Sequence, residues 1–490
     1  MTAVEHRIYT AAQVRELDRL AIQEAGIPAY TLMSRAGQAT FEHIRYAWPA
    51  ATSVTILCGG GNNGGDGYVI GRLALQAGWQ VTLLSLGDVL RLGETAQQAY
   101  TDFLAIGGRV LPFDGELPKA DVMVDAMLGT GLDRIVEGAY AQAITLLNEQ
   151  SAPVVAVDIP SGLHADTGQA CGQAVEADMT VTFIGLKAGL LTGKACDYCG
   201  TLQFTRLAVP DSVYAQMPTD MYLLGAHTLH AYLPRRRRSS HKGNCGHTLL
   251  VGGAPGMSGA IKLAGEAALR VGSGLVSLAT HADHAPFINL LRPELMVHAV
   301  ESPVNLRPLL QRMTVIGIGP GMGQTAWSRG LLTMIQTAPQ PKVLDADALN
   351  LLAQVPAKRE DWVLTPHPGE AARLLATEVW QIEQDRVQTI RQLQKQYGGV
   401  VVLKGAGTLV ASAGGIAFCP AGNPGMASGG MGDTLTGAIA GLLAQGLSLA
   451  AAAEVGVWVH AVAADLAARK GERGMLASDL IAHLQQAVNA

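Results

Sequence analysis

The sequence predicts two consecutive α/β domains, each built on a parallel sheet that helices cover. Two successive blocks alternate β-rich apolar runs with helical runs, as βαβ units do. The chain has 490 residues, of which 49% are hydrophobic and 15% are charged, so it is long enough for two or more well-packed domains. Its 58 glycines lie between the apolar runs, where tight strand-to-helix turns need them, and do not form a low-complexity tract.

Strand-like apolar runs can be assigned in both blocks. The strands expected in the first block are Val54–Cys58, Gln80–Ser85, Val122–Asp125, Val154–Ile159 and Thr180–Ile184. The strands expected in the second block are Thr248–Gly252, Leu275–Ala279, Val315–Ile318, Lys342–Asp345, Trp362–Leu364 and Val400–Lys404. Each run tends to end in glycine or a carboxylate. Because ligands of open α/β sheets bind at the carboxyl ends of strands, polar residues there are the best functional candidates.

The boundary between the two domains is expected near residue 220. Residues 208–240 are the least organised stretch, with prolines and with the run Arg235–Arg238, which we interpret as a solvated linker. The predicted domains are therefore residues 1–220 and 221–490. No repeat of short period is present.

Composition excludes several partners. A net charge of −5 gives no general attraction to nucleic acid or to acidic membranes. The apolar stretch Leu449–Ala468 contains Glu454, His460 and Asp465, which favours a buried helix over a membrane span. The first thirty residues are rich in charge and lack the apolar core of a secretory signal, so we expect a cytoplasmic enzyme. Surplus apolar surface leads us to expect a homo-oligomer.

The cysteines favour a reducing compartment. Their positions are Cys58, Cys171, Cys196, Cys199, Cys245 and Cys419. Cys196 and Cys199 form a C-x-x-C motif, but no second close pair completes a structural zinc site, and a strand-like run from Thr201 to Phe204 follows it. We expect ordinary thiols.

The first candidate site follows strand Val54–Cys58. The segment Gly59–Gly67 precedes a helical run from Tyr68, so its backbone amides could hold a pyrophosphate. Its glycines formally satisfy G-x-G-x-x-G, but the next strand ends at Ser85 without the acid that binds ribose, which disfavours a standard dehydrogenase. Asn62, Asn63 and Asp66 are better suited to an amide-bearing or ionic ligand than to a simple turn.

Two further strand ends of the first block carry oxygen ligands. Asp125 precedes Ala126–Leu132, and Asp158 precedes an Ile-Pro-Ser-Gly segment that contains Ser161. Asn63, Asp125 and Ser161 could coordinate a hard cation, which leaves Asp158 as an acid or base. Each aspartate taken singly could equally be a cap or a turn residue, but the three loops together favour a site.

The motifs Gly59–Gly67, Asp125–Gly131 and Val157–Gly162 closely resemble those of the YjeF N-terminal domain, the NAD(P)H-hydrate epimerase family, over about the first 215 residues. The resemblance implies a Rossmann-like three-layer sandwich that interconverts the two C6 epimers of hydrated NADH or NADPH. It implies K⁺ at Asn63, Asp125 and Ser161, and Asp158 as the acid/base. Lys187 could assist or could be a surface charge. The implied substrate contacts are Asn62, Asn63, Gly64, Gly65, Asp66, Gly129, Thr130, Gly131, Leu132, Asp133, Arg134, Ile135, Tyr140 and Asp158.

The second block contains the most informative stretch, Asn423–Asp433. Its many small residues offer free backbone amides in front of one carboxylate, Asp433, and a helical run from Leu435 to Leu443 follows. Such a helix N-terminus suits a phosphate, and the carboxylate could take a proton from an attacking hydroxyl. The alternative is a glycine-rich turn with Asp433 as an ordinary cap.

Other strand ends of this block also carry polar residues. They are Gly319–Gly323, Asp345–Asn350, Thr365–Glu370 with His367 between two prolines, and Lys404–Thr408. Lys404–Thr408 offers a cation, small residues and a hydroxyl to nucleotide phosphates or ribose. His367 could contact a substrate or be a structural histidine. Neither a P-loop nor a protein-kinase signature is present.

These motifs, with Gly256–Ala260 and Gly474–Asp479, resemble the ribokinase-like superfamily and, within it, the ADP-dependent NAD(P)H-hydrate dehydratase family, over residues 230–490. The resemblance implies that Ala260, Gly323, His367 and Asp433 contact the S-epimer of the hydrate. It implies that Lys404, Gly405, Ala406, Gly407, Thr408 and Gly432 bind ADP, with Mg²⁺ bound to the nucleotide, although no residue excludes ATP. In this scheme Asp433 is the catalytic base.

The order of the two domains resembles that of the bifunctional bacterial repair enzymes. The sequence leaves three alternatives open. One is a ribokinase-like vitamin kinase whose product is a stable phosphate ester. A second makes the first domain a non-catalytic dimerisation or ligand-binding module, and a third is a hydride-transferring oxidoreductase.

Overall fold

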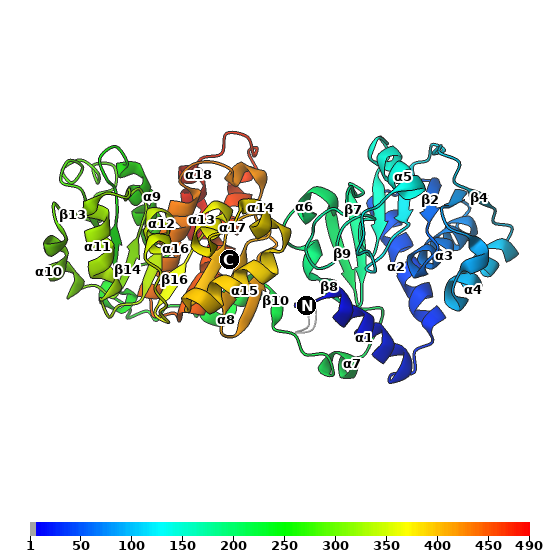
Figure 1. Ribbon diagram of the computed structural model, residues 1–490, viewed down its shortest axis with the longest axis horizontal. Helices are drawn as coiled ribbons and strands as arrows, with labels where there is room; N and C mark the ends of the chain where they lie inside the picture. Colours follow the sequence, from blue (N-terminus) through cyan, green and yellow to red (C-terminus); the bar gives the residue numbers. More distant parts are fainter. Residues whose placement is uncertain (1–5) are drawn as a thin grey trace. The chain divides into compact units, whose positions relative to one another are not determined.

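The computed structural model describes residues 6–490. The chain divides into two compact units, Met1–Met221 and Tyr222–Ala490, and each is described here by itself. Strand β10 (Met221–Leu223) contains the point of division. Figure 1 shows that each unit combines a sheet with helices along its strands.

The sheet of the first unit is parallel, with the strand order β4-β3-β2-β5-β6-β7-β9. Its strands are β2 (Ser53–Cys58), β3 (Gln80–Ser85), β4 (Val110–Pro112), β5 (Val122–Ala126), β6 (Val154–Val157), β7 (Met179–Phe183) and β9 (Thr201–Thr205). Short strands β1 (Arg7–Tyr9) and β8 (Leu186–Lys187) pair with each other in parallel. The central strands are buried on both faces, which explains why the sequence shows them as continuous apolar runs.

Helices cover both faces of this sheet. They are α1 (Ala11–Gln23), α2 (Ala29–Ala47), α3 (Asn62–Gln76), α4 (Glu94–Ala105), α5 (Gly138–Asn148), α6 (Ala195–Tyr198) and α7 (Asp211–Ala215). One core cluster joins α1 to α4 with one face of the sheet, and another joins α5 with the opposite face. The unit is therefore the predicted three-layer sandwich. Because the strand order reverses between β2 and β5, the loops after these strands diverge and leave room for a ligand.

The sheet of the second unit runs β13-β12-β11-β14-β15-β16-β17 in parallel and continues with antiparallel β18 and β19. Its strands are β11 (His247–Val251), β12 (Leu275–Thr280), β13 (Leu295–Ala299), β14 (Val315–Ile318), β15 (Lys342–Leu344), β16 (Trp362–Leu364), β17 (Val400–Leu403), β18 (Leu409–Ser412) and β19 (Gly415–Phe418). The hairpin β18–β19 is an addition to the strands that the sequence predicted.

The helices of the second unit are α8 (Ala226–Tyr232), α9 (Ser258–Arg270), α10 (Arg307–Leu310), α11 (Ala326–Gln336), α12 (Ala346–Gln354), α13 (Pro368–Leu375), α14 (Val379–Gln384), α15 (Arg386–Tyr397), α16 (Met431–Ala444), α17 (Leu449–Ala468) and α18 (Ala477–Ala487). The main core cluster packs α9, α16, α17 and α18 together. A Cβ atom at Gly437 would lie 1.9 Å from the carbonyl oxygen of Ala264, so only glycine allows α16 to lie this close to α9.

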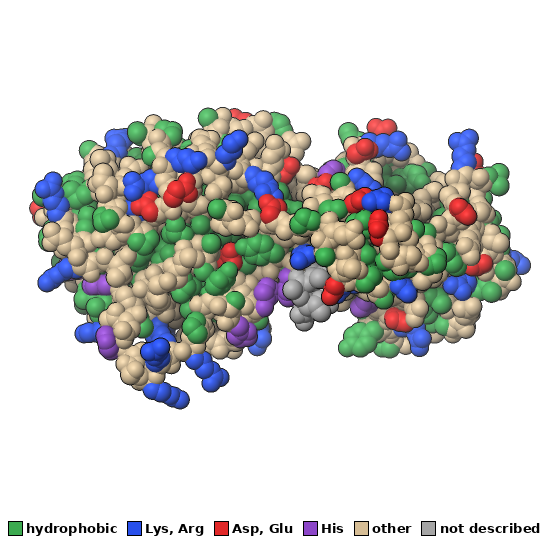
Figure 2. Space-filling view, turned by 90° about the horizontal axis from the view of Figure 1, so that it is seen from below, with side chains coloured by type: hydrophobic (Ala, Val, Ile, Leu, Met, Phe, Trp, Pro, Cys, Tyr) green, Lys and Arg blue, Asp and Glu red, His purple; other side chains and the backbone are tan. Residues whose placement is uncertain are grey.

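One helix and one face of the surface bear on the sequence predictions about membranes and about charge. Within residues 6–490, Leu449–Ala468 is the one helix long and apolar enough to cross a membrane, and 67% of it is buried inside the unit. On the face drawn in Figure 2, positive and negative side chains are interspersed over most of the surface.

Two predicted boundaries were wrong in an informative way. The structure places Asn62–Gly67 in the first turns of α3, so only Gly59–Gly61 forms the loop that was expected to extend to Gly67. Helix α16 begins at Met431, four residues before the predicted start. In both cases glycines that read as a loop are helical because packing, and not their intrinsic preference, determines the backbone.

Candidate active sites

The first site is a cavity of about 890 Å³ above the carboxyl ends of β2, β5 and β6. Predicted contact residues that line it are Asn62, Asn63, Asp66, Gly129, Thr130, Gly131, Leu132, Asp133, Arg134, Ile135, Tyr140 and Asp158. Gly64 and Gly65 are not among the lining residues. A Cβ at Gly64 would lie 2.0 Å from the carbonyl oxygen of Gly59, and one at Gly65 would lie 2.4 Å from Met33 Cε, so close packing explains both glycines.

Asp158 and Lys187 form a buried ion pair in this cavity. Asp158 follows β6 with a φ of +67°, a left-handed conformation that aspartate tolerates and that ends the strand two residues before the predicted Ile159. Its Oδ1 accepts a hydrogen bond from Lys187 Nζ, and also from Thr182 and from the backbone N–H of Phe183 at 3.3 Å each. Lys187 is fully buried, so it is not a surface charge. These contacts leave Asp158 Oδ2 for a ligand.

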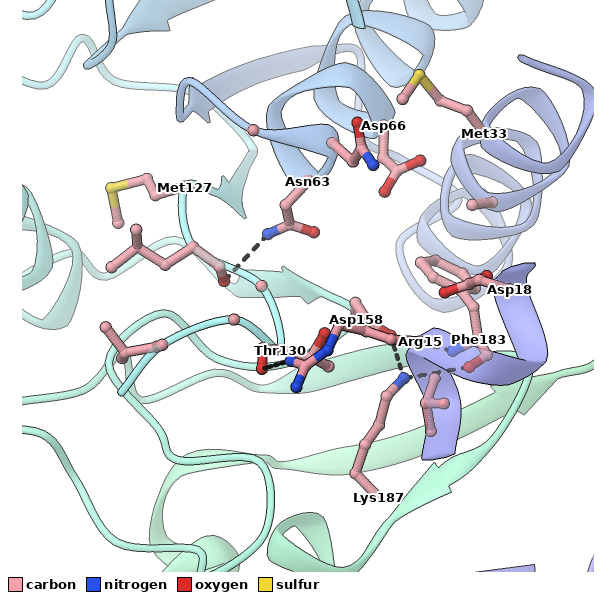
Figure 3. A pocket seen from close by; sticks show the side chains of 18 of the residues that line it. Arg15, Asp18, Met33, Asn63, Asp66, Met127, Thr130, Asp158, Phe183 and Lys187 are labelled. Carbon is pink, nitrogen blue, oxygen red and sulfur yellow. Dashed lines mark hydrogen bonds and ion pairs between the residues drawn. The ribbon is translucent and has the colours of Figure 1, made fainter. Parts of the chain in front are cut away.

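Two more carboxyl groups line the same cavity (Figure 3). Burial raises the pKa of Asp66 well above its ordinary value, and the negative charges of Asp158 and Asp18 raise it further. Burial also raises the pKa of Asp18 to about 6, with a contribution from Asp158. The cavity wall also carries the carboxyl groups of Asp133 and Glu137 and the cations Arg15, Arg134 and Lys187.

The three residues predicted to hold a cation lie around Leu128. Asn63 Nδ2 donates to the carbonyl oxygen of Leu128 at 3.2 Å, and Ser161 Oγ accepts from its N–H at 2.8 Å. Ser161 also donates from Oγ and from its backbone N–H to Asp125, at 2.6 and 2.7 Å. Burial raises the pKa of Asp125 to about 6, although the hydrogen bonds from Ser161 lower it. Asn63 Oδ1 is buried, and no group of residues 6–490 donates a hydrogen bond to it.

The second site centres on Asp345, which follows β15. Its Oδ1 accepts hydrogen bonds from Lys404 Nζ at 2.6 Å and from Thr365 Oγ1 at 2.8 Å, and its Oδ2 accepts from Thr436 Oγ1 at 2.8 Å. These donors come from the ends of β17 and β16 and from α16. One buried carboxylate therefore fixes three elements around the place where a substrate would react.

Lys404 lies among several acidic groups. Its Nζ is 3.7 Å from Glu370 Oε2, and Glu370 also accepts the backbone N–H of His367 at 2.8 Å. Burial lowers the pKa of Lys404, but the charges of Asp345 and Glu370 outweigh this and raise it overall. His367 caps α13 and is half exposed, and burial and the Lys404 charge lower its pKa. A neutral imidazole at this position can accept or donate a hydrogen bond.

Asp433 lies in the first turn of α16. Burial raises its pKa to about 6; the charge of Asp345 adds to this effect and that of Lys404 opposes it. A Cβ at Gly432 would lie 3.2 Å from Lys404 Nζ and 3.6 Å from Asp345 Oδ2. Gly432 therefore keeps the backbone of the turn close to the ion pair.

Partners from α17 and from the segment before α18 hold the glycine-rich segment in place. Asp465 accepts from Gly422 N–H at 3.1 Å and from Asn423 Nδ2 at 2.8 Å. Ser428 Oγ donates to the carbonyl oxygen of Met475 at 3.1 Å. The buried His460 lies 3.0 Å from the carbonyl oxygen of Met431, and burial lowers its pKa to about 4, so it is neutral at pH 7.

The β17–β18 loop, Lys404–Thr408, rests on a buried arginine. Arg386 Nη2 donates to the carbonyl oxygens of Leu403 and Lys404 at 3.2 and 3.1 Å. A Cβ at Gly405, which has a φ of +136°, would lie 3.0 Å from the guanidinium. The arginine thereby fixes the backbone at the start of the loop.

Comparison with known proteins agrees with this geometry. Residues 29–189 match the family described as YjeF-related protein N-terminus, and residues 248–486 match the NAD(P)H-hydrate dehydratase family. The bifunctional NAD(P)H-hydrate repair enzyme of Coxiella burnetii is 49% identical over 485 residues, which cover 98% of this chain and 99% of that protein. This chain belongs to the bifunctional NAD(P)H-hydrate repair enzyme family.

Solved structures resemble the second half of this family member. A ribokinase-like superfamily protein from Enterococcus faecalis is 31% identical with a TM-score of 0.52, and the match covers 55% of this chain and 96% of that one. The NAD(P)H-hydrate dehydratase of Bacillus subtilis, described as ADP/ATP-dependent and crystallised with ATP and Mg²⁺, is 32% identical with a TM-score of 0.49, over 54% of this chain and 96% of that one.

Sequence reasoning missed three residues that the structure brings into the sites of this family member. Asp18 lies one turn beyond the buried Val14 on α1 and lines the first cavity. A carboxylate beside the apolar stripe of a helix was the sequence feature that could have identified it. Asp345 stands at a strand end, in a polar segment that was noted without a role for this residue. Arg386 gave no signal, because its contacts with the loop are to backbone carbonyl oxygens, although it also pairs with Glu383 at 2.7 Å.

Proposed function

We propose that this chain repairs hydrated NADH and NADPH. Residues 1–220 would interconvert the R and S hydrates at C6, and residues 221–490 would convert the S hydrate to NAD(P)H with ADP. Family membership over the whole chain supports both activities. The observation that carries the proposal is that both sites retain a complete acid/base set, Asp158 with Lys187 in the first and Asp433 with Lys404 and Asp345 in the second.

In the second site, Asp433 takes the proton of the C6 hydroxyl as this oxygen attacks the β-phosphoryl group of ADP. AMP leaves, and a phosphate ester forms at C6. The ring nitrogen then expels phosphate, and loss of a proton from C5 completes the double bond. Amides at the start of α16 stabilise the transferred anion, and Lys404 lies beside them. Ala260, in the first turn of α9, and Gly323, His367 and Asp433 would contact the hydrate.

The β17–β18 loop and Gly432 would bind ADP. When bound with the nucleotide, Mg²⁺ neutralises phosphate charge. Among residues 6–490 the structure has no group of three or more His, Cys, Asp or Glu side chains that could hold a metal. This supports an ion bound mainly by phosphate and water, as Mg²⁺ prefers, with Asp345 and Glu370 supplying oxygen atoms nearby.

In the first site, Asp158 would act as the acid/base at C6, with Lys187 as its buried ion-pair partner. We propose K⁺ at Asn63, Asp125 and Ser161. The buried Asn63 Oδ1 without a partner supports this assignment, because an oxygen ligand of a cation would complete its interactions. We also propose a cytoplasmic homo-oligomer: the six cysteines are free, and Phe287, Leu290 and Leu291 expose apolar surface.

The test is a repair assay on a mixture of both hydrate epimers with Mg²⁺ and ADP, with ATP as a parallel donor. Absorbance of the regenerated dihydronicotinamide gives the yield. We expect complete recovery by the wild-type chain, recovery that stops at the S fraction for Asp158→Ala, and none for Asp433→Asn. Each variant serves as the folding control for the site it leaves intact.

Three outcomes would contradict the proposal. Wild-type recovery that stops at the S fraction, after correction for spontaneous epimerisation, would leave only the dehydratase. The first unit would then be a binding module. No recovery with either nucleotide would exclude the repair function and favour a vitamin kinase, and a stable phosphorylated product would identify one.

A further inference from the structure

Inversion at one carbon requires chemistry on both faces of the ring, and the first cavity has a carboxyl group on each of two opposite sides. Asp66 projects from α3, whereas Asp158 follows β6, and both line the cavity. In Figure 3 the two side chains lie on opposite sides of open space, with Asp18 on α1 at a third side. A flat ring placed between Asp66 and Asp158 would present one face to each.

The two carboxyl groups differ in their surroundings. Asp158 accepts three hydrogen bonds, one of them from the buried ammonium of Lys187. Within residues 6–490 the structure gives the Asp66 carboxyl no hydrogen bond and no ion pair, and its strongest charged neighbours are the carboxylates Asp158 and Asp18. Burial and these charges raise the pKa of Asp66 well above its ordinary value, which suits it to the role of a proton donor.

We infer that Asp66 is a second catalytic residue of the epimerase, which acts on one face of the hydrated ring while Asp158 acts on the other. The inference rests on the proposed function of the first unit and adds a mechanism to it. Asp66 stands three residues after Asn63 and one helical turn further into α3, so it serves the reacting carbon while Asn63 remains with the predicted cation.

The reaction then runs in two steps. Asp66 donates its proton to the C6 hydroxyl, the C6–O bond breaks, and the lone pair of N1 forms a C6=N1 iminium as water leaves. A second water attacks C6 from the opposite face, and Asp158 takes its proton. The product is the other epimer, in which the π electrons of the C6=N1 bond have returned to N1 as its lone pair. The proton has moved from Asp66 to Asp158 and returns through solvent, or through turnover in the reverse direction.

The cavity stabilises the intermediate of this scheme. The iminium carries a positive charge, and the carboxylates of Asp66 and Asp158 at that stage lie on the walls around it, with Asp18 on a further wall. In the free cavity the charge of Asp158 raises the pKa of both Asp66 and Asp18, so a cation between these groups relieves a repulsion. Attraction is therefore stronger in the charged intermediate than in the neutral substrate, which is the condition for catalysis.

The experiment follows inversion of purified R hydrate in H₂¹⁸O by chiral separation and mass spectrometry, with spontaneous epimerisation subtracted. The variants are Asp66→Asn, Asp66→Glu and Asp18→Asn in the full chain. We expect the wild-type enzyme to incorporate one solvent oxygen per inversion. Asp66→Asn should lower kcat by about 100-fold or more with KM nearly unchanged. Asp66→Glu should recover part of this loss, and Asp18→Asn should lose less than tenfold.

Several outcomes would overturn the inference. Inversion with the original oxygen retained would mean that the N1–C6 bond opens to an aldehyde and closes on the other face. Asp66→Asn activity within fivefold of wild type, or an effect on KM alone, would make Asp66 a binding residue. A loss of kcat in Asp18→Asn as large as that in Asp66→Asn would assign the second face of the ring to Asp18 on α1. If Asp66→Asn does not fold, full activity of Asp66→Glu would contradict a positioned acid. Absence of any wild-type acceleration would instead refute the proposed epimerase.

Discussion

Asp433 provides a test in which activity and stability should change in opposite directions. Replacing it with asparagine removes the proposed base and keeps the size of the side chain. Among residues 6–490 no hydrogen bond reaches this carboxyl, so asparagine loses no partner there. We expect the dehydratase rate to fall by about 100-fold or more and the unfolding free energy of the second unit to rise at pH 7.

The magnitude follows from the pKa. Burial, together with the charge of Asp345, raises the pKa of Asp433 from 3.8 to about 6. Between these two pH values the folded chain retains a proton that the unfolded chain has released, so the ionised group destabilises the fold more as pH rises. The cost is about 3 kcal/mol at pH 7 and about 1.6 kcal/mol at pH 5. Loss of the favourable helix-dipole interaction offsets up to about 1 kcal/mol, so Asp433→Asn should stabilise by about 2 kcal/mol at pH 7.

Thermal unfolding of wild type and variant at pH 7 and pH 5 measures this difference, and subtraction removes the contributions of other titrating groups such as His460. A gain of about 2 kcal/mol corresponds to about 4 to 8 °C in the Tm of the second unit. Asp479→Asn is the matched control, because Asp479 also lies in the first turn of a helix of this unit but accepts a backbone N–H, at 2.9 Å from Leu476. It should not stabilise.

The reasoning fails if Asp433→Asn lowers the Tm at pH 7 or raises it equally at both pH values. Retention of dehydratase activity by this variant would refute the assignment of the base.

Three further changes give sharp expectations. Arg386→Met should raise the Kd for ADP by about tenfold, because the β17–β18 loop loses its buried support. Arg386→Lys should restore little of the lost affinity, since lysine lacks the fork geometry of the guanidinium. Calorimetric titration with ADP measures both variants. Lys187→Met should lower epimerase kcat/KM, because the Asp158 carboxylate loses its buried ion-pair partner, and an unchanged kcat/KM would contradict a role for Lys187. Ser161→Ala should destabilise the first unit by about 1 to 3 kcal/mol, since it removes a buried hydrogen bond to Asp125. It should also weaken the activation of the epimerase by added K⁺, measured against Na⁺. An unchanged K⁺ dependence would contradict the proposed cation site.

Much of the fold could be predicted because buried parallel strands are continuous apolar runs. Gln80–Ser85, Val315–Ile318 and Trp362–Leu364 were predicted with the bounds that the structure has. The short strand β1 and the hairpin β18–β19 were missed, since pairing partners define them more than local composition does. The glycines after Asn62 were misread for a similar reason, because contacts with Met33 and Gly59 hold them in a helix.

The sites could be predicted in part because strand ends place polar residues at one edge of a sheet. Asp158 was found in this way, whereas Asp433 was found from the glycine-rich segment that precedes a predicted helix. The sequence could not show that Lys187 is buried against Asp158, since the six-residue segment from Thr182 to Lys187 must turn back on itself to bring Lys187 to Asp158. Nor could it show that Asp345 joins three elements, because the partners are 20, 59 and 91 positions away along the chain.

The buried helix α17 has a consequence for synthesis of the chain. Its apolar side chains pack on α18, which lies later in the sequence, and on α16. During translation at about 5 to 20 residues per second, α17 exists for about 1 to 4 s before α18 is complete. In that interval a segment with the length and hydropathy of a membrane span lacks one of its covers. Chaperones that bind nascent apolar helices should therefore engage this segment, and a chain shortened before Ala477 should aggregate even though every residue of both catalytic sites remains.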